Sequence, residues 1–234
     1  PGITRIHNPA KEPEIADLAH ILATMGAKIE IVESTVIIEG REELHGATHH
    51  VIPDRLHAGT FMIAAALCGE DVNIECIPEH VRPLIDALKQ IGIAIEEDSD
   101  GLVISSSHTK KLRPMAIETG PYPNFATDHH PMIVPLLAIA EGKSTLTENV
   151  FEDRFRYVDE FRKMGADIEI DRRTAIIRGV KSLHSAAVTS HDIRAGVALV
   201  LAALSAEGVT EIDDEADHIA RGYSDLGGDL QRLG

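Results

Sequence analysis

The sequence predicts an α/β fold built from a β-α-β-α-β-β unit that occurs three times. Recurring residues along the 234-residue chain indicate the repeat. In the repeat, one glycine ends an amphipathic segment and a second glycine ends an apolar segment. An aspartate comes just before the apolar segment, and an arginine comes after it. The first glycines are Gly26, Gly92, Gly165 and Gly234, the second Gly69, Gly142 and Gly208, the aspartates Asp54, Asp128 and Asp192, and the arginines Arg82, Arg154 and Arg221.

Each unit contains a segment that is apolar on nearly every face. A helix of this kind is a buried helix, because none of its faces is suited to water. A short run of strand-like residues follows each one. The expected helices are 56–67, 131–140 and 193–204, and the expected strands are 72–77, 144–150 and 209–213.

An amphipathic helix and a pair of strands are expected next. In the first unit Val81, Leu84, Ile85 and Leu88 form a helical stripe at positions i, i+3, i+4 and i+7. A glycine ends the helix, and runs rich in β-branched residues indicate paired strands. These strands are 93–97 with 102–105, and 168–170 with 174–178.

The first segment of the chain lacks the front of its own unit. Residues 14–25 place apolar side chains on one helical face, but they begin in mid-pattern. We therefore expect the chain to begin inside a larger protein. Residues 1–52 are predicted to be the last unit of a second domain, and residues 53–234 a domain of three complete units.

Charge and composition exclude nucleic acid as a partner. The chain has 22 Lys and Arg against 38 Asp and Glu, so its formal net charge is −16. No basic run is longer than the two residues of Lys110-Lys111 or Arg172-Arg173, which is too short to follow a phosphate backbone. Aromatic residues make up 3% of the chain and tryptophan is absent, so no platform for base stacking is expected.

The same composition predicts a folded cytoplasmic protein without a membrane partner. A hydrophobic content of 44% is enough for a large aliphatic core. The sequence has no secretory signal and no uninterrupted apolar run of about 18 residues. Cys68 and Cys76 are too few for a disulfide framework and their spacing fits no zinc site, which favours a reducing compartment.

Seven short stretches carry a family resemblance. They are Lys11-Glu12-Pro13-Glu14-Ile15, Pro53-Asp54-Arg55, Phe125-Ala126-Thr127-Asp128, Phe151-Glu152-Asp153-Arg154-Phe155, Met164-Gly165-Ala166, Asp192-Ile193-Arg194-Ala195-Gly196 and Arg221-Gly222-Tyr223. Through them the chain resembles the C-terminal half of the UDP-N-acetylglucosamine 1-carboxyvinyltransferase family. The resemblance implies an inside-out α/β barrel, two domains of three units each, and an active site in the cleft between the domains.

The resemblance also implies an activity. Members of this family transfer the enolpyruvyl group of phosphoenolpyruvate to the 3′-hydroxyl of UDP-N-acetylglucosamine and release phosphate, which opens peptidoglycan synthesis. No cofactor is implied. Both substrates are anionic, so the site needs arginines for carboxylate and phosphate groups, and carboxylates for proton transfer.

Two aspartates match the family's catalytic carboxylates. Asp128 would bind the sugar hydroxyl and deprotonate it, and Asp192 would take part in proton transfer at C3 of phosphoenolpyruvate. The spacing alone favours another role, because an aspartate just before a helix is a common N-cap and Asp54 repeats the pattern. The resemblance reverses that preference for Asp128.

Other residues match substrate-binding positions of the family. Thr127 belongs to the motif of Asp128, and the backbone of Val150 would contact the uridine nucleotide. Without the resemblance, Val150 would be an ordinary strand residue and each arginine a surface residue paired with a carboxylate. The matched arginines are Arg154 and Arg221 at the anion site, Arg194 near the enolpyruvyl group, and Arg55 at the domain junction.

Three histidines depart from the family pattern. The family usually has Glu at His57, Gln at His130 and Thr at His191. Because histidine titrates near neutrality, these changes could alter pH dependence or substrate fit, or they could be tolerated changes around the site. Neighbouring histidines lack a cysteine or acidic ligand pattern, so we expect no metal. Those groups are His45-His49-His50, His129-His130 and His184-His191.

Part of the family's active site has no counterpart in the chain. A Lys-Asn pair and a mobile loop with a Cys or Asp general acid belong to the N-terminal half, and neither Cys68 nor Cys76 matches that loop. We therefore expect this chain to provide one wall of the cleft, to need the N-terminal half as a partner and to be inactive alone.

Two alternatives stay open. The first is 5-enolpyruvylshikimate-3-phosphate synthase, which has the same fold, although the stretches at 151–155 and 221–223 favour the nucleotide-sugar enzyme. The second is a non-catalytic paralogue or half-protein that binds a nucleotide sugar or a partner chain.

Overall fold

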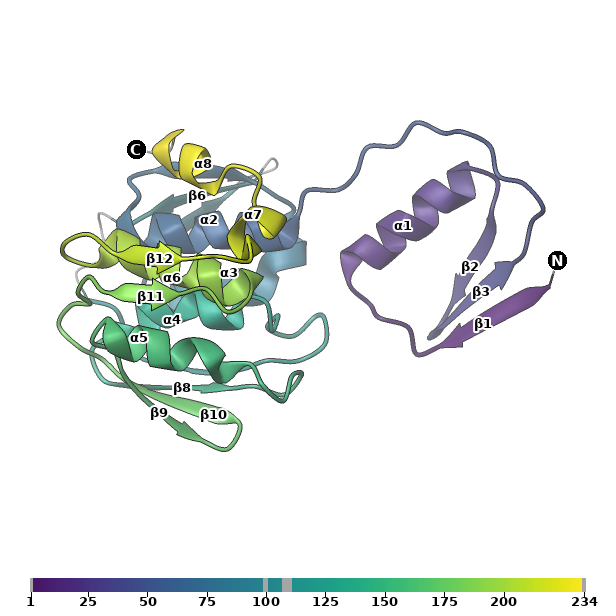
Figure 1. Ribbon diagram of the computed structural model, residues 1–234. Helices are drawn as coiled ribbons and strands as arrows, with labels where there is room; N and C mark the ends of the chain where they lie inside the picture. The colour runs from purple at the N-terminus through teal and green to yellow at the C-terminus, as the bar shows by residue number, and fades with distance from the viewer. Residues whose placement is uncertain (1, 99–100, 107–110, 233–234) are drawn as a thin grey trace. The chain divides into compact units, whose positions relative to one another are not determined.

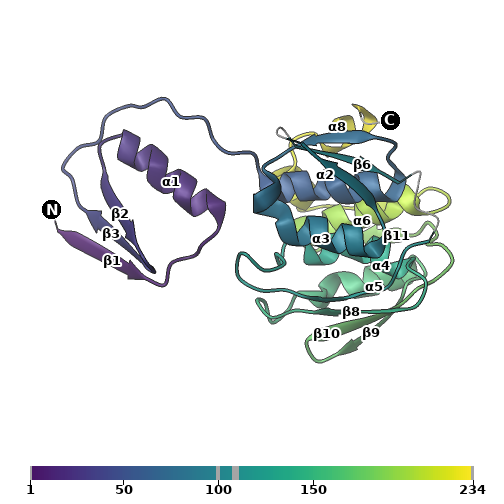
Figure 2. The ribbon, with the colours of Figure 1, turned by 180° about the vertical axis from the view of Figure 1, so that it is seen from behind.

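The computed structural model describes residues 2–98, 101–106 and 111–232, so the repeat glycine Gly234 lies outside the described residues. The chain forms two compact units, labelled by element in Figures 1 and 2. We call them the N-terminal unit and the main unit. The N-terminal unit is Pro1–Pro53 with Pro121–Pro123, and the main unit is Asp54–Gly120 with Asn124–Gly234.

The N-terminal unit consists of a three-stranded antiparallel sheet and one helix. This helix is the one predicted at residues 14–25, and it ends before Gly26, whose φ of +99° is left-handed and favours glycine. Apolar side chains such as Leu18 and Ile31 are exposed in this unit. In sheet order the strands are β1 (Ile3–His7), β3 (Thr35–Glu39) and β2 (Lys28–Val32), and the helix is α1 (Pro13–Thr24).

Three helices form the centre of the main unit (Figure 1). They pack on one another, and most of their side chains are fully buried. Glycine allows a close approach at Gly59, where a Cβ atom would lie 2.2 Å from Nε2 of His129. The helices are α2 (Arg55–Cys68), α4 (His130–Ala138) and α6 (Ile193–Ser205), which confirms the three predicted buried helices.

Three sheets lie around the central helices (Figures 1 and 2). Buried and exposed side chains alternate along several strands, so that one face of each such strand packs on the core. In sheet order the strands are β4 (Val72–Glu75), β6 (Gly101–Ser105) and β5 (Ala94–Glu97); β7 (Ala116–Glu118), β8 (Lys143–Thr147), β10 (Thr174–Arg178) and β9 (Asp167–Asp171); and β11 (Ala187–Thr189) with β12 (Glu211–Asp213). The pairs β7–β8 and β11–β12 are parallel and the others are antiparallel.

Four shorter helices complete the main unit. The predicted stripe is confirmed, because Leu84, Ile85 and Leu88 are fully buried and Gly92 ends their helix. A short 3₁₀ turn at 78–81 precedes the helix that begins at Arg82, and another at 155–157 precedes the helix that begins at Val158. The helices are α3 (Arg82–Ile91), α5 (Val158–Lys163), α7 (His218–Gly222) and α8 (Leu226–Arg232).

The three repeats are not equally complete. The middle one has all six elements, in the order β7, α4, β8, α5, β9 and β10. The first has no strand at residues 40–54 before α2, and the third has no strand pair among residues 214–232. The prediction of three complete units was therefore wrong. The predicted arrangement, with apolar helices inside and sheets outside, is confirmed.

Candidate active site

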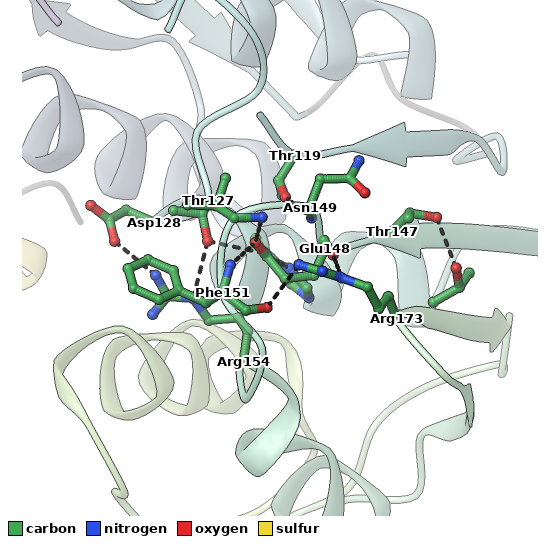
Figure 3. A network of polar contacts seen from close by, with 12 residues as sticks. Thr119, Thr127, Asp128, Thr147, Glu148, Asn149, Phe151, Arg154 and Arg173 are labelled. Atoms are coloured by element: carbon green, nitrogen blue, oxygen red, sulfur yellow. Dashed lines mark hydrogen bonds and ion pairs between the residues drawn. The ribbon is translucent and has the colours of Figure 1, made fainter. Parts of the chain in front are cut away.

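A carboxylate and two arginines meet in the main unit near the N-terminal ends of α4 and α6. Figure 3 shows two of the three, Asp128 and Arg154. Oδ1 of Asp128 lies 3.1 Å from Nη2 of Arg154 and 3.5 Å from Nε of Arg194. The side chains are 32%, 12% and 21% exposed, so solvent and ligands have only partial access to them. We call these three residues the Asp128 cluster.

The three repeated aspartates do not share one role. Oδ1 of Asp54 accepts hydrogen bonds from the backbone N–H groups of Leu56 and His57, and Asp192 caps α6 in the same way. Asp128 caps nothing, because α4 starts one residue later and its N-cap position is occupied by His129. The capping interpretation is therefore right for Asp54 and Asp192 and wrong for Asp128, whose carboxylate faces arginines.

Arg194 links the two predicted catalytic aspartates. Its backbone N–H donates to Oδ1 of Asp192 over 2.8 Å, while its side chain lies at Asp128. The first turn of α6 therefore holds Asp192 and carries the guanidinium that reaches the start of α4. The structure thus brings Asp128, Asp192, Arg154 and Arg194 into one local arrangement, although the predicted role of each stays a proposal.

Thr127 joins this cluster to a buried carboxylate (Figure 3). Nε of Arg154 donates to the Thr127 hydroxyl over 3.2 Å, and that hydroxyl donates to Oε2 of Glu148 over 3.0 Å. The Arg154 guanidinium also lies 4.6 Å from the centre of the Phe151 ring. Arg154 is therefore held by a hydroxyl, a carboxylate and an aromatic face.

Glu148 is the main site residue that the sequence did not predict. It is fully buried, and its second oxygen accepts from the N–H groups of Val150 and Phe151 at 2.8 and 2.9 Å. Burial alone would raise the pKa of Glu148, but hydrogen bonds from His130 and from these two N–H groups outweigh it and hold the pKa at about 2. Glu148 is thus a buried, ionised anchor for the turn after β8.

The repeat offered a signal for Glu148. Asp214 occupies a similar place after β12, and its carboxylate accepts from the backbone N–H groups of His218 and Ile219. In both units an acidic residue just after the second strand binds the backbone of the next turn. A comparison of strand ends, in addition to helix starts, would have found both carboxylates.

His130 has a defined place behind the site. Its Nδ1 lies 2.7 Å from Oε2 of Glu148 and its Nε2 lies 2.8 Å from the Tyr157 hydroxyl. Burial lowers the pKa of His130, which favours the neutral ring. This histidine therefore fills a hydrogen-bonding position within the core instead of facing a ligand.

The other two unusual histidines make different contacts. The ring of His57 stacks on Tyr223, with ring centres 5.4 Å apart, and contacts Phe61 at 4.8 Å. His191 is 39% exposed and lies 3.3 Å from Glu160. These three contacts are made with residues outside the Asp128 cluster, but Tyr223 itself interacts with the Arg194 side chain, and His191 immediately precedes Asp192.

The remaining predicted residues are placed less directly. Arg55 begins α2, and its charge helps to lower the pKa of the buried His129. Arg221 is exposed in α7, and among the described residues 111–232 the ion pairs of Asp128 are with Arg154 and Arg194 instead. The Val150 N–H is already bound to Glu148, so a ligand would have to use the Val150 carbonyl.

The described ranges contain neither a cluster of metal-ligating side chains nor a membrane-spanning helix. Within them, no group of three or more His, Cys, Asp or Glu side chains is arranged to hold a metal ion. No described helix has the length and apolar character needed to cross a membrane.

Sequence comparison identifies the family. Residues 1–230 match the family described as EPSP synthase (3-phosphoshikimate 1-carboxyvinyltransferase). The chain belongs to the EPSP synthase family. Among members of the EPSP synthase family, it is 50% identical to UDP-N-acetylglucosamine 1-carboxyvinyltransferase 1 of Halalkalibacterium halodurans and 46% identical to UDP-N-acetylglucosamine 1-carboxyvinyltransferase 2 of Bacillus subtilis. The resemblance predicted from the sequence is therefore confirmed.

The alignments include the whole chain but only part of each relative's length. They cover 100% of this chain, but 53% of the first relative and 54% of the second. The chain thus spans about half the length of the curated relatives it matches.

Solved structures of the EPSP synthase family share the fold. The enolpyruvyl transferase NikO from Streptomyces tendae superposes with a TM-score of 0.87 at 30% identity, over 100% of this chain and 56% of that one. EPSP synthase from Acinetobacter baumannii gives a TM-score of 0.75 at 22% identity, over 100% of this chain and 57% of that one, which shows the fold alone. The predicted enolpyruvyl transferase-like α/β fold is confirmed.

Proposed function

We propose that this chain is one half of an enzyme that transfers the enolpyruvyl group of phosphoenolpyruvate to the 3′-hydroxyl of UDP-N-acetylglucosamine, in the cytoplasm, as the first committed step of peptidoglycan synthesis. The names of the relatives at 46–50% identity support this substrate pair. The observation that carries the proposal is the Asp128 cluster, in which a carboxylate that caps no helix lies between two arginines.

The cluster has the groups that the reaction needs. The sugar oxygen must form a bond to C2 of phosphoenolpyruvate while C3 gains a proton; C3 then loses a proton, and the C–O bond to phosphate breaks. Asp128 would take the proton of the sugar hydroxyl, and Asp192 would serve the proton transfers at C3. Because Oδ1 of Asp192 already accepts two backbone hydrogen bonds, Oδ2 is the oxygen left for that task.

The arginines would hold the anionic groups. Arg154 and Arg194 already face one carboxylate, a geometry that suits the carboxylate and phosphate of phosphoenolpyruvate. Arg221, exposed on α7, and Arg55, at the start of α2, would join them when the substrates bind. Thr127 would keep Arg154 in place, and the Val150 carbonyl would contact the nucleotide.

The rest of the site would come from a second half. Residues 1–52 would complete a domain made largely by that half, and residues 53–234 would form one wall of the cleft. The alignments cover 53–54% of the relatives' length, which supports a site built from two halves of the protein. The half-chain alone is expected to be inactive.

Phosphate release tests the proposal. The full-length gene product is incubated with phosphoenolpyruvate and UDP-N-acetylglucosamine, and in parallel with phosphoenolpyruvate and shikimate 3-phosphate. We expect release only in the first mixture. Release only in the second would favour an EPSP synthase, the name that the family carries. Binding of the nucleotide sugar without release in either mixture would favour a non-catalytic binding protein.

A further inference from the structure

We propose that Glu148 is a positioning residue that holds Arg154 against Asp128 through the hydroxyl of Thr127. The catalytic consequence rests on the proposed function, whereas the geometry does not. The hydrogen bonds of the Glu148 carboxylate to described residues go to Thr127, His130, Val150 and Phe151, which lie outside the Asp128 cluster. Glu148 lies behind the cluster at the end of β8, where it ties together three segments that the fold brings from different places (Figure 3).

The Glu148 carboxylate is the acceptor in each of its four hydrogen bonds. Oε1 receives the N–H groups of Val150 and Phe151, which fixes the turn that leads to Arg154. Oε2 receives the Thr127 hydroxyl and Nδ1 of His130, at 3.0 and 2.7 Å. An ionised carboxylate accepts only, so it determines the direction of all four bonds.

The direction matters most at Thr127. A threonine hydroxyl has one proton, and here that proton points to Glu148. The Thr127 oxygen therefore presents lone pairs to Nε of Arg154, which can only donate and lies 3.2 Å away. With Nε held there, Nη2 of the same planar guanidinium lies 3.1 Å from Asp128.

His130 and Tyr157 keep Glu148 in place from behind. Since Glu148 can only accept, Nδ1 of His130 carries the proton, and the neutral ring must accept at Nε2. The Tyr157 hydroxyl, 2.8 Å away and fully buried, is the donor there. The chain of donors thus runs from Tyr157 through His130 to Glu148.

The side chain of Arg173, in the turn between β9 and β10, holds the backbone of the same segment. Nε of Arg173 donates to the carbonyl oxygen of Glu148 over 2.7 Å, and Nη2 reaches the carbonyl of Phe151 at 3.4 Å. The turn after β8 is therefore held at its backbone by Arg173 and at its start by the Glu148 side chain. This leaves Thr127 as the link between the anchored turn and the orientation of Arg154.

A series of variants of the full-length gene product tests this link. Thr127→Val removes the hydroxyl and keeps the shape, whereas Thr127→Ser restores the hydroxyl. Ser144→Ala is the matched control, because Ser144 is also fully buried, lies on β8, and has a hydroxyl that accepts from the Met115 N–H, away from Arg154. Glu148→Gln keeps the size of the anchor but cannot accept four hydrogen bonds.

Two readouts are used for each variant. The first is the NMR signal of the Arg154 Nε–H group, which needs no turnover. The second is kcat/KM for phosphate release. We expect Thr127→Val and Glu148→Gln to shift the Arg154 signal and to lower kcat/KM by about 10- to 100-fold, the effect of a misplaced catalytic group. Thr127→Ser should recover most of the kcat/KM that Thr127→Val loses, because it restores the hydroxyl. Ser144→Ala should stay within about twofold of wild type, which is well below a tenfold change in rate.

The outcomes separate the two proposals. An unchanged Arg154 signal in both Thr127→Val and Glu148→Gln would overturn the positioning role, whether or not the protein turns over. A shifted signal with unchanged kcat/KM would overturn it as well, because the orientation would not matter for the reaction. A wild-type protein without phosphate release would contradict the proposed function alone.

Discussion

Arg154 donates a hydrogen bond from Nη2 to Oδ1 of Asp128 over 3.1 Å and thereby connects the turn after β8 to the segment before α4. This contact distinguishes Asp128 from Asp54 and Asp192, which bind backbone N–H groups at helix starts. Of the three repeated aspartates, Asp128 is the one that is not an N-cap.

The aspartates should respond differently to loss of charge. Asp54→Ala removes a helix cap and should lower the free energy of unfolding by about 1 kcal/mol. Asp128→Ala removes no cap and should leave stability nearly unchanged. Urea unfolding of both variants checks this. An equal loss of stability in the two would contradict the assignment of Asp128 as a residue free of capping.

His130 should tolerate glutamine but not leucine. The amide of glutamine can donate to Glu148 and accept from Tyr157, as the neutral imidazole does. Leucine leaves a buried carboxylate and a buried hydroxyl each without one partner, which should cost about 1–3 kcal/mol or more. Thermal unfolding of the two variants measures the difference, and equal midpoints would show that the buried network adds no stability.

Stability should fall in mildly acidic solution because of His129. Burial first, and then the charge of Arg55, lower the pKa of His129 to about 4 from its usual 6.5. Between these values the unfolded chain binds a proton that the folded chain does not, so stability present above pH 6.5 is lost as the pH falls towards 4. Urea unfolding from pH 7 to pH 4 measures the loss. His129→Asn should flatten the profile, and an unchanged slope would sink the assignment to this residue.

Gly59 should not accept a larger residue. A Cβ atom there would lie 2.2 Å from Nε2 of His129, so Gly59→Ala must displace the ring or separate α2 from the start of α4. We expect a loss of about 1–3 kcal/mol, typical of an overfilled core. The double variant Gly59→Ala with His129→Ala should recover part of the loss. If the double variant is as unstable as the sum of both single variants, the clash is not with this ring.

Local patterns were enough to predict the elements, and the family resemblance part of the site. The apolar segments became α2, α4 and α6, whereas the repeat alone favoured a helix cap for Asp128 and a surface role for Arg154, and only the family resemblance made both of them site residues. Local patterns could not show where α4 begins. The helices α2 and α6 begin directly after their aspartates, whereas α4 begins two residues after Asp128, so that Asp128 is not the N-cap. Such a shift depends on packing around His129 and not on the residue pattern.

Buried polar partners were beyond the reach of the sequence. Glu148 and His130 are 18 residues apart in the chain, and His130 and Tyr157 are 27 apart. Their contacts depend on how β8, α4 and the turn before α5 pack together. From the sequence, His130 is a departure from the family pattern next to a proposed catalytic aspartate. In the structure it completes a buried hydrogen-bond network.

Phosphate release by the full-length gene product and by its Asp128→Asn variant measures whether the Asp128 carboxylate takes part in the reaction. Asn keeps the size of the side chain but cannot take the proton of the sugar hydroxyl. We expect release by the wild type with phosphoenolpyruvate and UDP-N-acetylglucosamine, and a turnover lower by about 100-fold or more in the variant, with the fold intact. Equal turnover in the two proteins would contradict this role of the Asp128 carboxylate.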